Sequence, residues 1–462
     1  MPGALAPDVG PALSAGQPGW FRCCNYQTEP SDARPGRNTR PKAPDAALDA
    51  PPCRGTVKTG GGHGNGGAPL DGERSGPVGY GLVGAGAFGR FCLEQYGELD
   101  DVRLVAVADQ NRDAARSAAE AFGLAPCTFE ELVAREDVEI VHVATPPFTH
   151  RELAEKALEA GKHVLLEKPL AVTVGDGRAI VEAARSAGRV LAVNIIMRHA
   201  PLAGAVKRMV TDGLLGSPLR GYFENYAKGE PLPPSHWFWD RAKSGGIFIE
   251  HGVHFFDLFR WWLGEGVVLS ATEIARPPLR PARAADGPGG DDTGPVDQVI
   301  CTCLYAKQVP VTFYHGFTQA TRMDRQELRL VFEHGDVTLH EWVPTRCRVD
   351  AILCDPDVAR LRDILPGCEV ETVERYSGDG RRCTIRGCEF EVDRRVRVSY
   401  DPGMSKGQVY GTVLRGLLAD MAAAVRDASH ERLVTEADAL RALETAARAG
   451  EMAESCARGE GA

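Results

Sequence analysis

Short apolar runs alternate with amphipathic segments between Pro77 and about Ile196. The apolar runs predict strands at "VGYGLVGAG" (78–86), "VRLVAVAD" (102–109), "VEIVHVAT" (138–145), "HVLLE" (163–167) and "VLAVNII" (190–196). The segments between them have helical spacing, and Thr128-x-x-Glu131 and Thr149-x-x-Glu152 are typical helix-capping boxes. Because continuous Val, Ile and Leu strands alternate with helices, we predict a parallel sheet covered on both faces.

The pattern changes after Arg198, where one helix (202–213) is followed by longer alternating strands. These strands are predicted at 219–227, 296–306, 309–319, 327–335 and 336–342. Two more helices, 410–428 and 435–457, lie near the end of the sequence. The pattern predicts a second, α+β domain with a large, mostly antiparallel open sheet. We therefore expect one domain at 77–197 and another at 198–462.

Residues 1–76 have little apolar periodicity and are rich in Pro, Gly, Ala and charge, as in "PSDARPGRNTRPKAPDAALDAPP" and "TGGGHGNGG". Such a segment cannot bury enough surface to offset the entropy lost on ordering it. We therefore expect a disordered N-terminal extension. A functional arm and an over-long gene start stay open as alternatives, since no Met occurs between Met1 and Met197.

The composition is that of an ordinary globular protein, with 43% hydrophobic and 25% charged residues among 462. The formal net charge of −10 and the lack of a basic stripe argue against a nucleic-acid partner. No apolar run approaches the length of about 18 residues that a membrane span requires. Thirteen cysteines occur without a Cys-x-x-Cys pair, and no export signal is recognisable. We expect a cytoplasmic protein with free thiols.

The glycine-rich turn Gly84-x-Gly86-x-x-Gly89 follows a predicted strand and begins a predicted helix. Gly84 permits a tight turn, Gly86 lets the backbone approach a pyrophosphate, and Gly89 allows close packing of helix on strand. Together with Ala87 and Phe88, the turn offers unpaired helix N–H groups to the phosphates. The motif predicts a Rossmann dinucleotide-binding domain; a glycine turn in a nucleotide-free sheet is the alternative.

Asp109 ends the second predicted strand, about 20–25 residues after the glycine turn. A carboxylate at this position accepts the ribose hydroxyls of NAD and repels the 2′-phosphate of NADP. Arg112 is close by in the sequence and would accommodate that phosphate. NAD is therefore the expected cofactor, and NADP stays open.

Several motifs follow one another along the chain: "GAGAFG" (84–89), "VAD" (107–109), "ATPPFTH" (144–150), "GKHVLLEKPLA" (161–171) and "GG…E…GVH…D" (245–257). Together they resemble the Gfo/Idh/MocA oxidoreductase family over most of residues 78–455. The resemblance implies that NAD(P) binds to the first domain. It implies that a small-molecule polyol, usually a sugar or cyclitol, binds against the open sheet of the second domain. It also implies pairing through that sheet into a homodimer or homotetramer.

Glu167-Lys168-Pro169 is the most specific short signature of this resemblance. It stands at the carboxyl end of a predicted strand, where ligands bind in such sheets. The resemblance implies that Lys168 points at the substrate carbinol and that Glu167 lies near the nicotinamide ribose. An ammonium group there can stabilise a developing alkoxide.

The loop from Thr145 to His150 runs along the cofactor in relatives. The resemblance therefore makes Thr145, Pro146 and His150 predicted cofactor contacts. His150 has a second interpretation, as a histidine at a helix start with a purely structural hydrogen bond.

The stretch "GGIFIEHGVHFFDLFRWWLG" (245–264) contains Glu250, His251, His254 and Asp257. On a regular helix Glu250, His254 and Asp257 share one stripe, and His251 points about a quarter-turn away. His251 and His254 have a spacing that could bind a metal, but no further ligand motif occurs in the sequence, so no metal is predicted. A buried histidine that is only hydrogen-bonded also stays open.

The resemblance gives this cluster an acid–base role. The family usually carries an Asp four residues before a His that exchanges the hydroxyl proton during hydride transfer. Here Glu250 stands at that position before His254, and we predict that it orients the imidazole, whose pKa near neutrality suits proton exchange. Asp257 either contacts substrate or, preferably, anchors the helix. Further predicted substrate contacts are Asn194, Arg198 and Trp239.

These expectations combine into one function, with Lys168, His254 and Glu250 as catalytic residues. It is an NAD(P)-dependent oxidoreductase that interconverts a secondary alcohol and a ketone on a sugar, cyclitol or related polyol. Two other classes use the same scaffold. One is a hydrolase or lyase that uses tightly bound NAD in a transient redox cycle, and the other is a non-catalytic NAD(P)-binding sensor.

Overall fold

The computed structural model describes residues 76–229, 232–233, 235–276 and 295–458. The extension predicted at 1–76, apart from Gly76, and most of the loop between the strands that end at Ala275 and begin at Val296 lie outside the described residues. Within the described ranges, no helix is both long enough and apolar enough to cross a membrane.

The first sheet has six parallel strands in the order β3-β2-β1-β4-β5-β6. Its strands are β1 Val78–Val83, β2 Val102–Ala108, β3 Ala125–Cys127, β4 Ile140–Val143, β5 His163–Leu166 and β6 Leu191–Val193. The central strands β1 and β4 are buried along their whole length, because helices cover the sheet. The predicted parallel dinucleotide-binding architecture is confirmed.

Three of the five helices of this sheet begin at side-chain caps, at Asn111, Thr128 and Thr173, and the helices that begin at Ala87 and His150 have none. They are α1 Ala87–Tyr96, α2 Arg112–Phe122, α3 Phe129–Ala134, α4 His150–Glu159 and α5 Val174–Ala187, and a 3-10 turn, η2 Pro147–Thr149, precedes α4. The capping box of Thr128 and Glu131 is confirmed. The box predicted at Thr149 is wrong, because the η2 turn directs the Thr149 hydroxyl to the carbonyl of Pro146 at 2.8 Å.

The second sheet has nine strands in the order β14-β17-β13-β12-β11-β7-β10-β9-β8. They are β7 Pro218–Lys228, β8 Gly266–Ala275, β9 Val296–Tyr305, β10 Val309–Gln319, β11 Arg325–Phe332, β12 Gly335–His340, β13 Arg346–Leu353, β14 Glu369–Arg375 and β17 Arg394–Tyr400. Only β7 and β10 pair in parallel, so the predicted mostly antiparallel sheet is confirmed. The sequence pattern did not reveal that β7 lies between β10 and β11, which follow one another in the chain.

The remaining helices, 3-10 and π turns and a short hairpin complete this part of the chain. They are η3 Ile196–His199, α6 Pro201–Thr211, η4 Trp237–Trp239, α7 Arg241–Ser244, η5 Phe248–Gly252, α8 Val253–Leu263, η7 Ala306–Gln308, α9 Asp355–Ile364, η8 Gly378–Arg381, β15 Arg382–Ile385, β16 Cys388–Glu391, α10 Lys406–Arg426 and α11 Glu436–Ala457. β15 and β16 form a separate hairpin. Both predicted C-terminal helices are present, and α10 contacts α1 while α11 contacts α5, α8 and β8.

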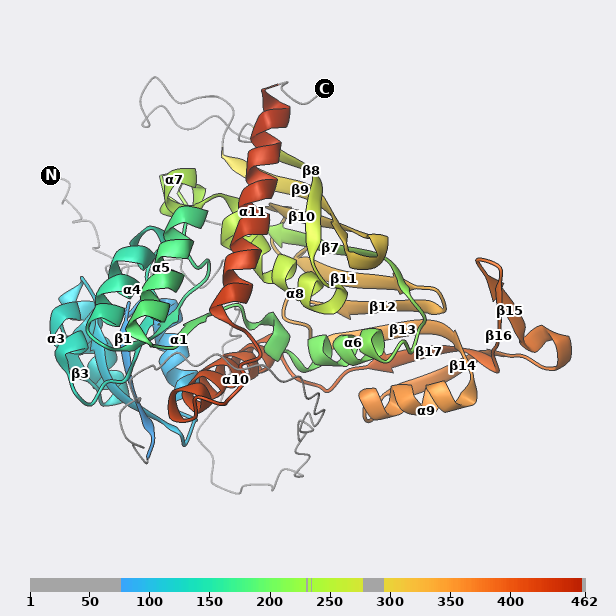
Figure 1. Cartoon of the computed structure of the whole chain (residues 1–462), viewed down its shortest axis with the longest axis horizontal. Helices are drawn as coiled ribbons and strands as arrows, with labels where there is room; N and C mark the ends of the chain where they lie inside the picture. Colours follow the sequence, from blue (N-terminus) through green and yellow to red (C-terminus); the bar gives the residue numbers. More distant parts are fainter. Residues whose placement is uncertain (1–75, 230–231, 234, 277–294, 459–462) are drawn as a thin grey trace, which may run out of the picture. The chain divides into compact units, whose positions relative to one another are not determined.

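One face of the nine-stranded sheet packs against α8 (Figure 1). Phe223 on β7 stacks on Phe255, with ring centroids 3.5 Å apart. Phe313 on β10 meets Phe256 and Phe259 edge-on, at 4.8 and 5.2 Å. Aromatic rings bury large apolar areas, so these contacts hold the segment that contains the histidine cluster against the sheet.

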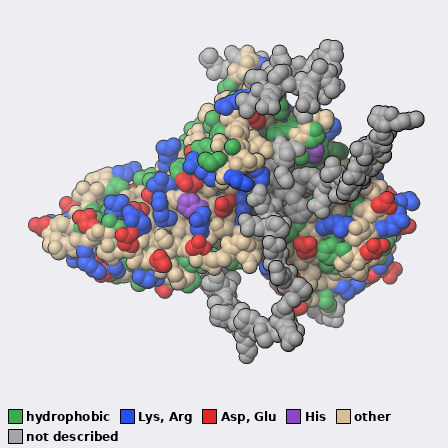
Figure 2. All heavy atoms as spheres, turned by 180° about the vertical axis from the view of Figure 1, so that it is seen from behind, with side chains coloured by type: hydrophobic (Ala, Val, Ile, Leu, Met, Phe, Trp, Pro, Cys, Tyr) green, Lys and Arg blue, Asp and Glu red, His purple; other side chains and the backbone are tan. Residues whose placement is uncertain are grey.

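The molecular surface carries both signs of charge side by side (Figure 2). On the large sheet, for example, Arg329 pairs with Asp336 at 2.8 Å and Arg395 pairs with Asp350 at 2.8 Å. Exposed pairs of this kind contribute little to stability, because water and salt screen them. We therefore expect the functional charged groups among the buried side chains.

Candidate active site

A cavity of about 1120 Å³ opens at the carboxyl ends of β1, β2 and β4. Its lining includes most of the predicted cofactor contacts: Gly84, Gly86, Ala87, Phe88, Gly89, Asp109, Arg112, Thr145 and Pro146. The volume suits a large ligand, and the helix α1 presents its N-terminus to it. The residues present therefore fit a dinucleotide.

The three glycines of the turn have different steric surroundings. Gly84 has φ +104°, and a Cβ there would collide with the carbonyl of Ala144. A Cβ on Gly89 would collide with the carbonyl of Gly84, whereas a Cβ on Gly86 would meet nothing within 4 Å. Packing thus requires glycine at 84 and 89, and only open space toward the cavity accounts for glycine at 86.

Asp109 connects the end of β2 to the glycine turn. Its Oδ2 accepts a hydrogen bond from the Ala85 backbone N–H at 2.7 Å, and its Oδ1 accepts one from Asn111 at 2.7 Å. Arg112 and Arg116 also line the cavity. The cavity therefore carries both the carboxylate that favours NAD and the cations that would accommodate NADP.

His150 is completely buried and does not line the cavity. Its Nε2 lies 3.0 Å from the carbonyl of Thr145 and its Nδ1 lies 2.9 Å from the carbonyl of Pro169. Burial lowers its pKa. This geometry fits the structural interpretation of His150, because the ring connects the Thr145 loop to the turn that contains Lys168.

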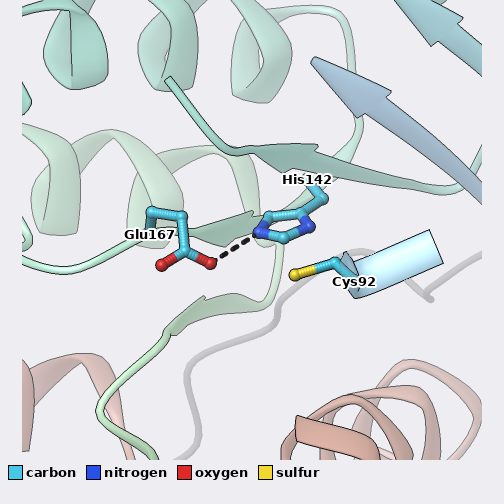
Figure 3. A group of neighbouring side chains, drawn as sticks. All are labelled: Cys92, His142 and Glu167. Atoms are coloured by element: carbon cyan, nitrogen blue, oxygen red, sulfur yellow. Dashed lines mark hydrogen bonds and ion pairs between the residues drawn. The ribbon is translucent and has the colours of Figure 1, made fainter. Parts of the chain in front are cut away.

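Glu167 turns into the sheet. Its Oε1 accepts a hydrogen bond from Nε2 of His142 at 3.0 Å (Figure 3). The same oxygen accepts a second one from Nδ2 of Asn194 at 2.7 Å. Asn194 is only 2% exposed, and its substrate contact stays a prediction. His142, on β4, escaped the sequence analysis because it occupies an apolar strand; a lone polar residue at a fully buried strand position was the available signal.

Lys168 connects the first sheet to the histidine segment. Its ammonium group donates to the backbone carbonyl of Glu250 at 2.9 Å and forms an ion pair with the carboxylate of the same residue. The Lys168 and Glu250 side chains are 13% and 6% exposed. The partner of Glu250 is therefore Lys168.

The segment Phe248–Gly252 is a π-helical turn, and the regular helix α8 begins only at Val253. The regular stripe expected from Glu250 onward is therefore wrong, because a π turn holds more residues than an α turn. Glu250 Oε2 and His254 Nδ1 are both buried, and neither has a hydrogen-bond partner within the described ranges. The predicted hydrogen bond between these two side chains is not formed.

His254 is 4% exposed and lies against Trp342, with ring centroids 5.8 Å apart. Burial, and after it the positive charge of Lys168, hold the pKa of His254 well below its ordinary value. The imidazole is therefore neutral at neutral pH. A neutral imidazole near an ammonium group can accept a proton while the cation stabilises an oxyanion.

His251 points away from His254 and meets His315 on β10. Their Nδ1 atoms lie 2.8 Å apart, and Phe223 packs against both rings. Burial lowers the pKa of both, that of His315 to about 3. The two histidines considered as a metal pair, 251 and 254, are therefore directed to different neighbours. His315 was missed, although it interrupts the inward-facing series Phe313 and Phe317.

Arg198 and Asp257 were both predicted substrate contacts, and the structure pairs them with each other. Arg198 donates from Nε and Nη2 to the two Asp257 oxygens at 2.8 and 2.6 Å. Asp257 is completely buried, and Arg198 also donates to Asp438 at 3.0 Å. Neither is free to reach a substrate. The preferred interpretation of Asp257 as an anchor describes this geometry.

Trp239 packs edge-on against Phe238 and Phe317, with ring centroids 4.7 and 6.4 Å away. It is absent from the lining of the cavity, which contains Trp237 instead. In the 3-10 turn η4 only Phe238 is buried, and the substrate contact of Trp239 stays a prediction.

Two family models match this chain in order. The one described as "Oxidoreductase family, NAD-binding Rossmann fold" matches residues 78–195, and the one described as "GFO/IDH/MocA C-terminal domain" matches residues 204–338. Together the two ranges cover more than half of the 462 residues.

Curated relatives match over shorter ranges. The chain is 31% identical over 254 residues to the D-apiose dehydrogenase of Paraburkholderia graminis, which is 53% of this chain and 61% of that protein. It is 32% identical over 188 residues to the inositol 2-dehydrogenase of Rhizobium meliloti, 41% of this chain and 56% of that protein. The chain thus spans about three fifths of the length of these relatives.

Solved structures share the fold. Levoglucosan dehydrogenase in complex with NADH has a TM-score of 0.64 at 20% identity, over 82% of this chain and 97% of that chain. A putative myo-inositol dehydrogenase from Sinorhizobium meliloti has a TM-score of 0.59 at 24% identity, over 82% and 98%. At these identities the similarity concerns the fold alone. With both family models matched, the chain belongs to the Gfo/Idh/MocA oxidoreductase family.

Proposed function

We propose that this chain is an NAD(P)-dependent oxidoreductase that interconverts a secondary alcohol and a ketone on a sugar, cyclitol or related polyol. The ion pair between Lys168 and Glu250 carries the proposal. It brings the carboxyl end of a dinucleotide-binding sheet to the turn that precedes His254, so a cation and a neutral imidazole meet at one place.

The cofactor would lie in the cavity lined by the glycine turn, Asp109 and Thr145. When bound, NAD(P) supplies the acceptor or donor of the hydride. In the oxidation direction His254 takes the hydroxyl proton, and the Lys168 ammonium group stabilises the developing alkoxide. Glu250 holds Lys168 in place. NAD is the preferred cofactor in this proposal, because Asp109 occupies the ribose end of the motif.

The names of the relatives support a polyol substrate. Besides the apiose and inositol dehydrogenases, a levoglucosan dehydrogenase of Pseudarthrobacter phenanthrenivorans is 29% identical over 230 residues.

We further propose a cytoplasmic homodimer or homotetramer that pairs through the open face of the nine-stranded sheet. Light scattering coupled to size-exclusion chromatography tests the oligomeric state, and a monomer would contradict it.

A panel of sugars, inositols and their keto forms, assayed with NAD and NADP by the absorbance of NADH or NADPH, tests the activity. We expect turnover of at least one polyol, and a loss of about a hundredfold in His254→Ala. His430→Ala is the matched control, because His430 pairs with Asp420 away from the site. Turnover by His254→Ala at the wild-type rate would contradict the assigned role.

A second candidate function is a lyase or hydratase that returns its hydride within each cycle. It is favoured by a relative named 2,7-anhydro-N-acetylneuraminate hydratase from Mediterraneibacter gnavus, 31% identical over 202 residues. The two candidates differ in one measurement. Net NADH accumulates during oxidation of an alcohol, whereas a recycled cofactor leaves the NADH concentration constant while product forms.

A further inference from the structure

Four polar side chains form a hydrogen-bonded chain across neighbouring strands of the first sheet. They come from β1 (Tyr80), β4 (His142), the end of β5 (Glu167) and the end of β6 (Asn194), which are adjacent in the strand order. The Tyr80 hydroxyl lies 2.6 Å from Nδ1 of His142, and Nε2 of His142 lies 3.0 Å from Oε1 of Glu167 (Figure 3). Asn194 donates to the same Oε1 at 2.7 Å.

The chemistry of these groups determines which atom donates and which accepts in each of these hydrogen bonds. An ionised carboxylate only accepts, so Nε2 of His142 carries the hydrogen and Nδ1 is left to accept from Tyr80. Burial raises the pKa of Tyr80 well above its ordinary value, so the phenol keeps the proton that it donates. Tyr80 and His142 are completely buried, which isolates the chain from water. Every donor in the chain is thus directed toward Glu167.

We propose that His142, supported by Tyr80, is a positioning residue that holds the Glu167 carboxylate in one orientation beside Lys168. The inference rests on the proposed function, because the family resemblance places Glu167 near the nicotinamide ribose. Oε1 takes both hydrogen bonds, which leaves Oε2 to accept a ribose hydroxyl. The Glu167 side chain keeps 10% exposure, so it is not sealed from the site.

The same place has a second chemical interpretation. Ligand atoms of Cys92, His142 and Glu167 lie within 4.8 Å of one another, an arrangement that could hold a metal ion (Figure 3). Both ring nitrogens of His142 and Oε1 of Glu167 already have hydrogen-bond partners, which favours the hydrogen-bonded chain. Titratable groups that face Glu167 are Tyr80, Cys92, Tyr96, His142 and His150, and Lys168 follows it in sequence.

Four variants separate positioning from packing. His142→Leu removes the donor to Glu167, and His142→Gln restores it, since the amide can donate to Glu167 and accept from Tyr80. Tyr80→Phe removes the hydroxyl that fixes the imidazole. Tyr96→Phe is its matched control, because the Tyr96 ring lies edge-on to Tyr80 at 5.5 Å but its hydroxyl is outside the chain.

NADH affinity, measured by fluorescence titration of the full chain, is the readout, with thermal unfolding as a check of folding. A carboxylate that loses a hydrogen-bond donor is no longer held in one orientation. We therefore expect His142→Leu to bind NADH about tenfold more weakly than the wild type. Tyr80→Phe moves in the same direction by a smaller amount, and His142→Gln and Tyr96→Phe match the wild type.

Three results would overturn the inference alone: an unchanged NADH affinity in folded His142→Leu, no rescue by His142→Gln, or equal effects of Tyr80→Phe and Tyr96→Phe. A stoichiometric metal ion in the purified wild type that His142→Gln loses would do the same. If His142→Leu does not fold, the comparison of the two tyrosine variants and His142→Gln decides. A wild type that does not bind NADH overturns the proposed function as well, so the two failures are distinguishable.

Discussion

The ammonium group of Lys168 forms a buried ion pair with the carboxylate of Glu250, although 82 positions separate the two residues in the chain. The pair joins the first sheet to the π-helical turn before His254. Removing one partner of a buried ion pair leaves an uncompensated charge, which costs more than the pair itself contributes. The stability of the chain and its proposed chemistry therefore depend on the same contact.

Glu250→Ala is expected to lower the free energy of unfolding by about 3 kcal/mol, because Lys168 loses the carboxylate that balances its charge. Chemical denaturation measures the change. The double variant Lys168→Met with Glu250→Leu should recover most of the stability and none of the turnover. Glu152→Ala, which breaks the exposed pair with Lys156, is the control and should change stability little. A stable, active Glu250→Ala protein would contradict this account.

The pair His251 and His315 makes stability depend on pH. Both pKa values are lowered by burial, that of His315 to about 3, so the folded state stays neutral while the unfolded state takes up protons below about pH 6.5. Stability is therefore independent of these groups above that pH and is lost as the pH falls toward the folded value, by about 1.4 kcal/mol per pH unit for each histidine.

His315→Leu removes one of the two groups that take up a proton when the protein unfolds. The unfolding free energy of this variant should therefore fall less steeply with decreasing pH than that of the wild type. Denaturant unfolding at several pH values gives the slopes. His430→Ala serves as the control, because His430 is a half-exposed partner of Asp420. Identical slopes for His315→Leu and the wild type would show that His315 is already protonated when folded, or that it stays neutral when unfolded.

Arg198 and Asp257 are expected to contribute to the stability of the fold and not to substrate binding. Asp257→Ala leaves a guanidinium 7% exposed without its main partner, so the free energy of unfolding should fall by about 3–5 kcal/mol. The Michaelis constant for the polyol should stay within about twofold, since neither residue is free to reach substrate. Steady-state kinetics at a temperature where the variant is folded tests this; a large rise in the Michaelis constant alone would restore the substrate role.

Substitutions at Gly86 and Gly89 are expected to affect different properties, namely NADH binding at Gly86 and the stability of the fold at Gly89. Gly86→Ala adds a methyl group where nothing lies within 4 Å, so it should fold normally and bind NADH at least tenfold more weakly. Gly89→Ala forces a methyl group onto the carbonyl of Gly84, so it should unfold at a clearly lower temperature. Thermal melts and NADH titrations of both variants test the pair. Equal behaviour of the two variants would mean that packing alone explains the motif.

Local pattern was sufficient for the fold class but not for the order of the strands in the second sheet. The parallel strands, the glycine turn and its steric requirements, the capping box at Thr128 and the antiparallel second sheet all follow from residue spacing. Such features depend on contacts within one strand, helix or turn, and side-chain periodicity records those contacts directly. Nine of the predicted cofactor contacts line one cavity; two of the nine, Thr145 and Pro146, were predicted from the family resemblance.

The partners of the buried polar side chains did not follow from residue spacing. The sequence by itself determined the fold class and the position of the cofactor motif, but only the tertiary structure decided that Glu250 meets Lys168, that His251 meets His315 and that Arg198 meets Asp257. It also decided that His142 supports Glu167. These pairs bridge 25 to 82 positions. Which partner each group finds depends on strand order and on the π turn before α8, and neither leaves a periodic signal in the sequence.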